Sequence, residues 1–353
     1  MPLAVTSVTG PVDVDKLGAI LTHEHLHMQF DCALQMPPKD LKYPNEPKET
    51  FALHNLGIVR QYPYSSKYNT KLDDVDTRAI ILDEILRYKA AGGGTIVENT
   101  VEGIGKNLSL LKQLGLESGV TIVAGTGFYI ACAQSHSVLC YSVETMHDIM
   151  LKELVEGNQD GIKCGIVGEI GSSWPIEDFE KRAIQATAYI QQETKKPVTF
   201  HPGRNSEAPF EIMRIFTEAG GDPKDVVMSH LDRTFYDEDQ LLEFAKLKTF
   251  TQYDLFGTET SHYQLQESID FLSDAQRIYK LKLLKDNGHL DQITVSHDIH
   301  TKHRLANFGG HGFAHFLQNV VPKMKVRGFT EEEINAITSE NPKRWLSQGA
   351  EKI

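Results

Sequence analysis

The order of apolar and polar positions along the chain predicts eight short strands that alternate with helices. Runs of branched and other apolar residues are typical of strands, and they occur at 17–23, 95–100, 121–125, 161–171, 198–201, 226–230, 250–254 and 293–298. Between these runs, apolar residues recur three and four positions apart, which predicts helices over 74–91, 107–118, 143–155, 175–190, 207–219, 238–247, 269–287 and 330–337.

Short strands separated by helices are typical of a parallel sheet covered by helices, which places the chain in the α/β class. Eight such repeats fit a closed (β/α)8 TIM barrel, formed as a single domain over residues 1–353. Residues 5–18 contain two β-prone pieces around Gly10-Pro11 and predict a short N-terminal hairpin or cover. An open, doubly wound sheet is the alternative architecture.

A long segment after the first strand, residues 31–72, carries several prolines and a group of tyrosines (Tyr62, Tyr64 and Tyr68) with little periodicity. Loops of this length in compact domains are usually functional or disordered. A lid beside the first strand end and a structural insertion are both open interpretations.

Composition narrows the classes of partner. The 353 residues include 36 basic and 48 acidic side chains, and a net charge of -12 argues against a nucleic-acid partner. No apolar run approaches the roughly 20 residues of a membrane helix, and the first residues do not resemble a secretory signal. The four cysteines form no Cys-x-x-Cys pair, so we expect reduced thiols in a cytoplasmic protein without a membrane partner.

The first candidate chemistry is the motif Thr22-His-Glu-His25, at the end of the first predicted strand. Side chains alternate along a strand, so His23 and His25 point the same way and can bind one metal ion, while Glu24 points the other way. An isolated His-x-His is a chance surface feature about as often as it is a metal site. The residues at the other strand ends therefore have to decide between the two interpretations.

Four further strand ends each supply a metal-binding side chain, and a barrel brings all strand ends to one rim. Taken singly, such a histidine is more often a hydrogen-bonded core residue, and such a glutamate is half of a salt bridge. Together, four imidazoles and two carboxylates suit zinc or a similar divalent ion, and six donors suit two ions better than one. The predicted ligands are His23, His25, Glu169, His201, His230 and Asp298.

Five motifs of this sequence, spread over nearly the whole chain, resemble the phosphotriesterase-related proteins of animals, in the amidohydrolase superfamily. The motifs are Thr22-His-Glu-His25, Gly165-Ile-Val-Gly-Glu-Ile-Gly171, His201-Pro-Gly-Arg204, Ser229-His-Leu-Asp-Arg233 and Val295-Ser-His-Asp-Ile-His-Thr-Lys302. The resemblance implies a binuclear metal barrel. His23, His25 and Asp298 would hold the more buried ion, and His201 and His230 the more exposed one.

The bridging ligand differs within the family. The organophosphate-hydrolysing relatives use a carboxylated lysine on strand 4, whereas the branch that this chain resembles uses the glutamate of Gly-Glu-Ile-Gly. Lys163 has the same strand parity as Glu169 but precedes it by six residues, about 20 Å at 3.3 Å per residue. We therefore expect Glu169 to bridge the ions, and Lys163 to point inward near the barrel floor.

Two ions that share a water would supply a hydroxide nucleophile, with Asp298 as the catalytic acid and base. The resemblance implies hydrolysis of N-acetyltaurine to taurine and acetate, with related N-acyl amino acids as weaker substrates. For an anionic N-acyl substrate we expect Arg204 or Arg233 to bind the sulfonate, with Lys302 and Arg304 in reserve, and Tyr253 to line the acyl pocket. The alternative is that the arginines form ion pairs with acids such as Asp232 or Asp254.

Three function classes remain open on the sequence. The first is the metal-dependent amidase, the second is a lactonase or phosphotriesterase with the same nucleophile and a wide apolar mouth, and the third is a metal-containing binding protein without catalysis. The complete ligand set argues against the third class. The arginines near the rim favour the first class over the second, and an oligomer is compatible with all three.

Overall fold

The computed structural model describes residues 3–40, 51–260 and 262–352. Eight parallel strands form one sheet in the order β10-β9-β8-β7-β6-β5-β4-β3. Their bounds are β3 Ala19–Glu24, β4 Gly93–Glu98, β5 Thr121–Thr126, β6 Ile166–Gly171, β7 Val198–His201, β8 Val226–Met228, β9 Phe250–Tyr253 and β10 Ile293–Val295.

The two edge strands of this sheet meet and close the barrel. Thr22 Oγ1 in β3 donates a hydrogen bond to the Val295 carbonyl oxygen in β10 at 3.1 Å, and the His23 amide donates to Ser296 Oγ at 3.1 Å. The predicted (β/α)8 barrel is confirmed, and the open sheet is wrong.

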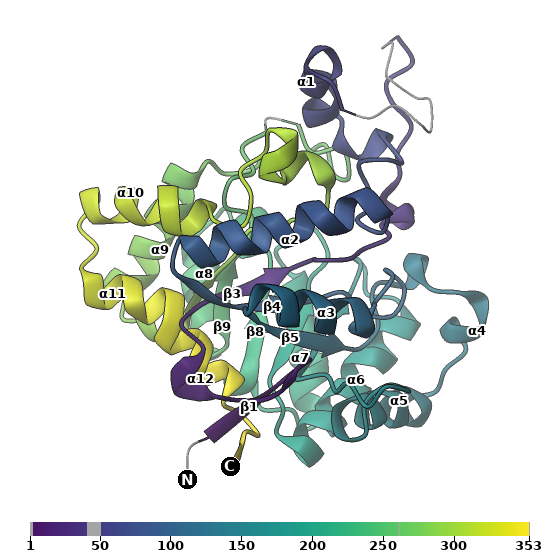
Figure 1. Ribbon diagram of the computed structural model, residues 1–353. Helices are drawn as coiled ribbons and strands as arrows, with labels where there is room; N and C mark the ends of the chain where they lie inside the picture. Colours follow the sequence, from purple (N-terminus) through teal and green to yellow (C-terminus); the bar gives the residue numbers. More distant parts are fainter. Residues whose placement is uncertain (1–2, 41–50, 261, 353) are drawn as a thin grey trace.

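Helices follow the strands and cover the outside of the barrel (Figure 1). Those that lie between successive strands are α1 Leu53–Gln61, α2 Val75–Ala90, α3 Leu108–Ser118, α4 His136–Leu139, α5 Val143–Val155, α6 Asp178–Thr194, α7 Ala208–Glu218, α8 Glu238–Ala245 and α9 Asp274–Asp286. The last three are α10 Val321–Val326, α11 Glu331–Asn335 and α12 Asn341–Leu346, with π-helical turns at Phe316–Val320 and Ala336–Glu340. Among the described residues, no helix is both long and apolar enough to cross a bilayer.

Helix α9 begins later than the predicted start at residue 269, because of its cap. The Ser273 hydroxyl accepts from the Gln276 amide, and the Gln276 side chain accepts from the Ser273 amide. This capping box satisfies donors that a helix start leaves open. The apolar residues before it belong to the irregular segment between β9 and α9.

The amino end of the barrel is closed by the two chain ends. The predicted hairpin is present as β1 Leu3–Ser7 and β2 Gly10–Asp13, and β11 Glu351–Lys352 pairs with β1, so the termini lie side by side (Figure 1). Trp345 is fully buried, and its Nε1 donates to the carbonyl oxygens of Val198 and Asp225. Val198 begins β7, and Asp225 directly precedes β8. Apolar packing therefore fills this end, which leaves the carboxyl end for polar side chains.

Two sequence expectations require correction. Strand β6 begins only at Ile166, so strand alternation does not extend to Lys163, and that side chain is exposed instead of pointing into the barrel floor. The segment 31–72, expected to lack periodic structure, contains helix α1 Leu53–Gln61. Its residues 41–50 lie outside the described residues.

Candidate metal centre

The structure brings all six predicted ligand side chains together at the carboxyl ends of the strands. His23 lies in β3 and His25 directly follows that strand, while Glu169 lies in β6 and His201 ends β7. His230 and Asp298 follow β8 and β10 in the turns beyond them. Each of the six residues is at most 6% exposed, so the group is shielded from bulk water.

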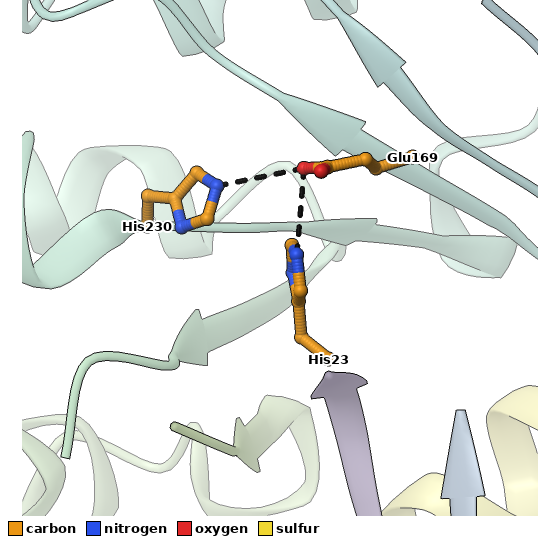
Figure 2. A group of neighbouring side chains, drawn as sticks. All are labelled: His23, Glu169 and His230. Atoms are coloured by element: carbon orange, nitrogen blue, oxygen red, sulfur yellow. Dashed lines mark ion pairs between the residues drawn. The ribbon is translucent and has the colours of Figure 1, made fainter. Parts of the chain in front are cut away.

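Glu169 lies at the centre of the four histidines. Its Oε2 is 3.0 Å from His201 Nδ1, 3.4 Å from His23 Nε2 and 3.6 Å from His230 Nε2, and its Oε1 is 3.6 Å from His25 Nε2. Figure 2 shows the His23 and His230 rings directed at this carboxylate. The two carboxylate oxygens thus face different histidines, as a bridging ligand requires.

Asp298 closes the other side of the cluster. Its Oδ1 lies 3.3 Å from His25 Nε2 and 3.7 Å from His23 Nε2. Within the described residues, two groups of three ligand atoms lie within 4.8 Å of one another: His23 with Glu169 and His230, and His23 with His25 and Asp298. Both groups are buried and share His23.

The ring nitrogens that face away from the cluster are held by other polar groups. Asp254, directly after β9, has carboxylate oxygens 3.1 Å from His23 Nδ1 and 2.9 Å from His230 Nδ1. His25 Nδ1 lies 2.9 Å from Thr100 Oγ1. These contacts turn the Nε2 atoms of His23, His25 and His230 toward Glu169, and His23 Nε2 has no hydrogen-bond partner among the described residues. A divalent cation fits this donor set, because partners of this kind orient metal-bound histidines.

The charges of the cluster depend on one another. Burial alone raises the pKa of Glu169, but His23 and His201 bring it well below its usual value. Burial lowers the pKa of His23, yet the carboxylates of Glu169 and Asp254 raise it well above the ordinary value. For Asp254, burial raises the pKa, but His230 and His23 lower it to about 2. The buried carboxylates therefore stabilise positive charge among them, the role that a metal cation would take.

Two of the ligands adopt left-handed backbone conformations, which are uncommon outside glycine. His230 has φ 58° and Asp298 has φ 50°. Hydrogen bonds fix both, since the His230 amide donates to Asp254 Oδ1 at 3.1 Å and the Asp298 amide donates to the His23 carbonyl oxygen at 3.2 Å. Strained residues that are held in this way occur frequently at functional sites.

A cavity of about 380 Å³ opens from the ligands toward a wall of arginine and aromatic side chains. Arg233 is 3% exposed, its Nη2 donates to the Pro202 carbonyl oxygen at 3.0 Å, and its Nη1 has no partner among the described residues. Besides the ligands, the lining consists of Met28, Phe30, Tyr64, Tyr129, Arg204, Arg233, Leu255, Tyr263, Leu265, Phe271, His300 and Arg304.

The alternative in which Arg233 pairs with an acid is wrong. Asp232 is bound by Arg277 at 2.8 Å, and Asp254 is taken up by the two histidines. Burial, followed by repulsion from Arg204, lowers the pKa of Arg233 below its usual value. Arg233 is thus a buried cation that faces the cavity and lacks a carboxylate partner among the described residues.

The other predicted substrate contacts fall in different places. Arg204 lines the cavity, and its Nε donates to Tyr263 Oη at 2.7 Å. Arg304 also lines it, but its Nη1 donates to the Asp298 carbonyl oxygen at 2.9 Å. Lys302 is buried, forms an ion pair with the partly exposed Asp74 and is not part of the lining.

Tyr253 does not reach the cavity. It is fully buried and packs in the main apolar core. Side chains alternate along β9, so Asp254 faces the ligands and Tyr253 faces the opposite side of the strand. The aromatic residues of the segment after β9 that line the cavity are Tyr263 and Phe271.

Sequence reasoning missed the polar contacts of three residues, Asp254, Tyr64 and Tyr263. Asp254 had a usable signal, because it follows β9 as the ligands follow their strands. Tyr64 Oη lies 2.9 Å from His300 Nε2, and His300 Nδ1 lies 3.1 Å from Asp298 Oδ2, so this loop histidine is a buried neighbour of a ligand. Tyr64 belongs to the tyrosine group of the segment 31–72, but its partner His300 is 236 residues away in the sequence, and nothing local marked Tyr263.

A closed (β/α)8 barrel with buried histidines and carboxylates at its carboxyl rim defines a metal-dependent barrel hydrolase. The comparisons with known proteins agree. The chain belongs to the phosphotriesterase family, whose model matches residues 3–346.

Relatives resemble the chain over nearly their whole lengths. A phosphotriesterase-related protein of Aedes aegypti is 48% identical, covering 97% of this chain and 98% of the relative, and an N-acetyltaurine hydrolase of Xenopus tropicalis is 48% identical, covering 97% of each. Among solved structures, a resiniferatoxin-binding protein from Rhodobacter sphaeroides has a TM-score of 0.92 at 27% identity, covering 97% of this chain and 94% of that one. The resemblance inferred from the five motifs is confirmed.

Proposed function

We propose that this protein is a binuclear metal-dependent amidohydrolase that cleaves N-acetyltaurine to taurine and acetate, and related N-acyl amino acids more weakly. One observation carries the proposal: five of the six proposed metal ligands and two arginines, Arg204 and Arg233, line the same cavity, and Arg233 lacks an acidic partner among the described residues. A substrate with a scissile amide at one end and an anion at the other places the amide at the metal ligands and the anion at the arginines. The naming of several relatives as N-acetyltaurine hydrolases supports this substrate.

Two divalent ions, zinc by preference, suit the donor set. His23, His25 and Asp298 would hold one ion and His201 and His230 the other, with Glu169 between them; this is supported by the Glu169 oxygens, which lie within 3.6 Å of a ring nitrogen of each of the four histidines. Such ions, when bound, supply a Lewis acid for the carbonyl oxygen and an activated water.

The side chains have distinct tasks in this reaction. Asp298 accepts the proton of the attacking water and returns it to the amine that leaves. His300 Nδ1 lies 3.1 Å from Asp298 Oδ2 and keeps that carboxylate turned toward the cavity. Arg204 and Arg233 bind the sulfonate, which places the carbonyl carbon over the ligands and holds the substrate in one orientation.

A lactonase or phosphotriesterase activity on the same metal site is the alternative. Such substrates are uncharged and would favour a wide, apolar mouth. The arginine wall favours the anionic amide, because a buried cation without a partner costs free energy that an anionic substrate recovers.

The proposal is tested with zinc-loaded enzyme and three substrates: N-acetyltaurine, a chromogenic phosphotriester and a lactone. We expect taurine release to have the highest kcat/KM, and we expect Asp298→Asn to abolish it. Equal or higher kcat/KM for the lactone or the phosphotriester would transfer the assignment to the alternative.

A further inference from the structure

Tyr263 occupies the partition between the metal cavity and a second cavity of about 810 Å³, and it lines both. It lies in the irregular segment between β9 and α9 and is 4% exposed. A tyrosine buried at this place shapes the metal cavity, and it also fixes the position of the side chains that it contacts.

Its main polar contact is Arg204. The Arg204 Nε donates to Tyr263 Oη at 2.7 Å, and the guanidinium carbon lies 5.2 Å from the centre of the tyrosine ring. Within the described residues, Nε makes the only hydrogen bond of the Arg204 side chain, so its two Nη groups remain for a ligand. A long arginine side chain held at one nitrogen loses most of its rotamer freedom before a ligand arrives.

Tyr263 is itself fixed by aromatic neighbours. Its ring centre lies 4.5 Å from that of Phe271 and 6.3 Å from that of Tyr64. Tyr64 is in turn bound to His300, the neighbour of Asp298. A chain of contacts therefore connects Arg204, through Tyr263 and Tyr64, to the side chains that hold the proposed metal ligands.

Arg233 supplies the second half of the anion site. Its Nη1 is buried and unpartnered among the described residues, and Arg204 is close enough to repel it. A single anion that accepts from both guanidinium groups would remove this repulsion. A sulfonate has three acceptor oxygens, which suffice for two arginines.

We propose that Tyr263 is a positioning residue that sets the preference of this enzyme for N-acyl substrates with a sulfonate on the amine side, by holding Arg204 so that its Nη groups and Arg233 Nη1 bind the same anion. The inference rests on the proposed function for the place of the anion. It assigns the selectivity to a contact that neither touches the scissile bond nor binds the metal.

The test is Tyr263→Phe in the full-length, metal-loaded enzyme, which removes the hydroxyl and keeps the ring. We expect KM for N-acetyltaurine to rise about tenfold, as for the loss of a hydrogen bond to a charged group, with kcat changed less than twofold. For N-ethylacetamide, which lacks the sulfonate, kcat/KM should not change. The matched control is Tyr236→Phe, since that tyrosine donates to Asp270 in the same segment but does not line the metal cavity.

A double-mutant cycle with Arg204→Met distinguishes positioning from a general structural role. If Tyr263 acts through Arg204, then Tyr263→Phe adds no further rise in KM once Arg204 is Met. Additive effects, or equal losses on the neutral amide, would overturn the inference.

Calorimetric titration of the metal-loaded enzyme with taurine keeps this inference separate from the proposed function. We expect about tenfold weaker binding to Tyr263→Phe than to the wild type and no change for Tyr236→Phe. If the wild type binds taurine but does not hydrolyse N-acetyltaurine, the proposed function fails. The role of Tyr263 is then still decided by the ratio of the taurine dissociation constants of Tyr263→Phe and the wild type. Unchanged binding in Tyr263→Phe would overturn the role whatever the activity.

Discussion

The two sides of the metal cavity are built on opposite principles. On the ligand side, the protein itself holds the nitrogens that face outward, with Asp254 at His23 and His230 and Thr100 at His25. On the arginine side, Arg233 Nη1 has no partner among the described residues. The ligand side therefore leaves negative charge for a cation, and the arginine side leaves positive charge for an anion.

This difference teaches where the specificity of the site lies. The ligand side follows strand ends, whose backbone is held by the sheet, and its excess of carboxylate favours a cation. The arginine side comes from turns beyond β7 and β8 and from the segment that carries Tyr263. Loops vary more readily than strands, so the same metal chemistry can be directed to different substrates by changing this wall alone.

The largest effect should come from breaking the centre of the ligand side. Glu169→Gln removes the negative charge that faces all four histidines, and we expect kcat to fall by roughly a thousandfold or more, with loss of bound metal. Metal content by mass spectrometry and taurine release measure the two effects. Glu84→Gln is the control, because Glu84 is equally buried but lies on α2 outside the cluster. Full metal content and activity in Glu169→Gln would refute the bridging role.

Removing the orienting carboxylate should have a smaller effect. In Asp254→Asn the charge behind His23 and His230 is lost while the ligands remain, and we expect metal affinity to fall roughly 10- to 100-fold. Competition with a chelator of known affinity gives the ratio. Activity should return at saturating metal, and a loss of kcat that excess metal does not restore would show that Asp254 has another role.

On the arginine side, the expected change is in substrate binding alone. Arg233→Met removes a buried cation, and we expect KM for N-acetyltaurine to rise roughly 10- to 100-fold, with little change for N-ethylacetamide. Arg204→Met should act in the same direction. Steady-state kinetics with both substrates measure the split, and equal effects on the two would dismiss the assignment of these arginines to the anion.

The smallest effect concerns stability outside the cavity, where Asp274 is bound by His315 at 2.7 Å and Arg277 at 3.0 Å. Burial raises the pKa of Asp274, but His315 and the other contacts lower it to about 2. The pKa of Asp in the unfolded chain is about 3.9, so the lower pKa in the folded protein stabilises the fold fully at pH values above that value. The stabilisation is lost as the pH falls through about 2.

Asp274→Asn should therefore cost about 2 kcal/mol of unfolding free energy at pH 7, and about half of that at pH 3. Urea unfolding at both pH values measures the difference. Asp239→Asn, at an exposed position on α8, should change neither value appreciably. A cost that stays constant between pH 7 and pH 3 would show that the ion pairs of Asp274 do not stabilise the fold.

The sequence by itself determined the barrel and which six side chains gather at its rim, because both depend on local patterns. An apolar run followed by a histidine or carboxylate specifies a strand and a side chain at its end, and parallel strands bring such ends to one rim. The spacing of six residues between Lys163 and Glu169 likewise favoured Glu169 as the side chain near the carboxyl end of β6.

Only the tertiary structure decided how the arginine wall is made. The contact between Arg204 and Tyr263 spans 59 residues and that between Tyr64 and His300 spans 236. Such contacts arise when loops from different strands pack over one cavity, and no periodicity in either segment encodes which side chains will meet. Tyr253 points into the core and Asp254 contacts two histidines because β9 ends between them. The packing of the barrel fixes this strand end, and composition does not.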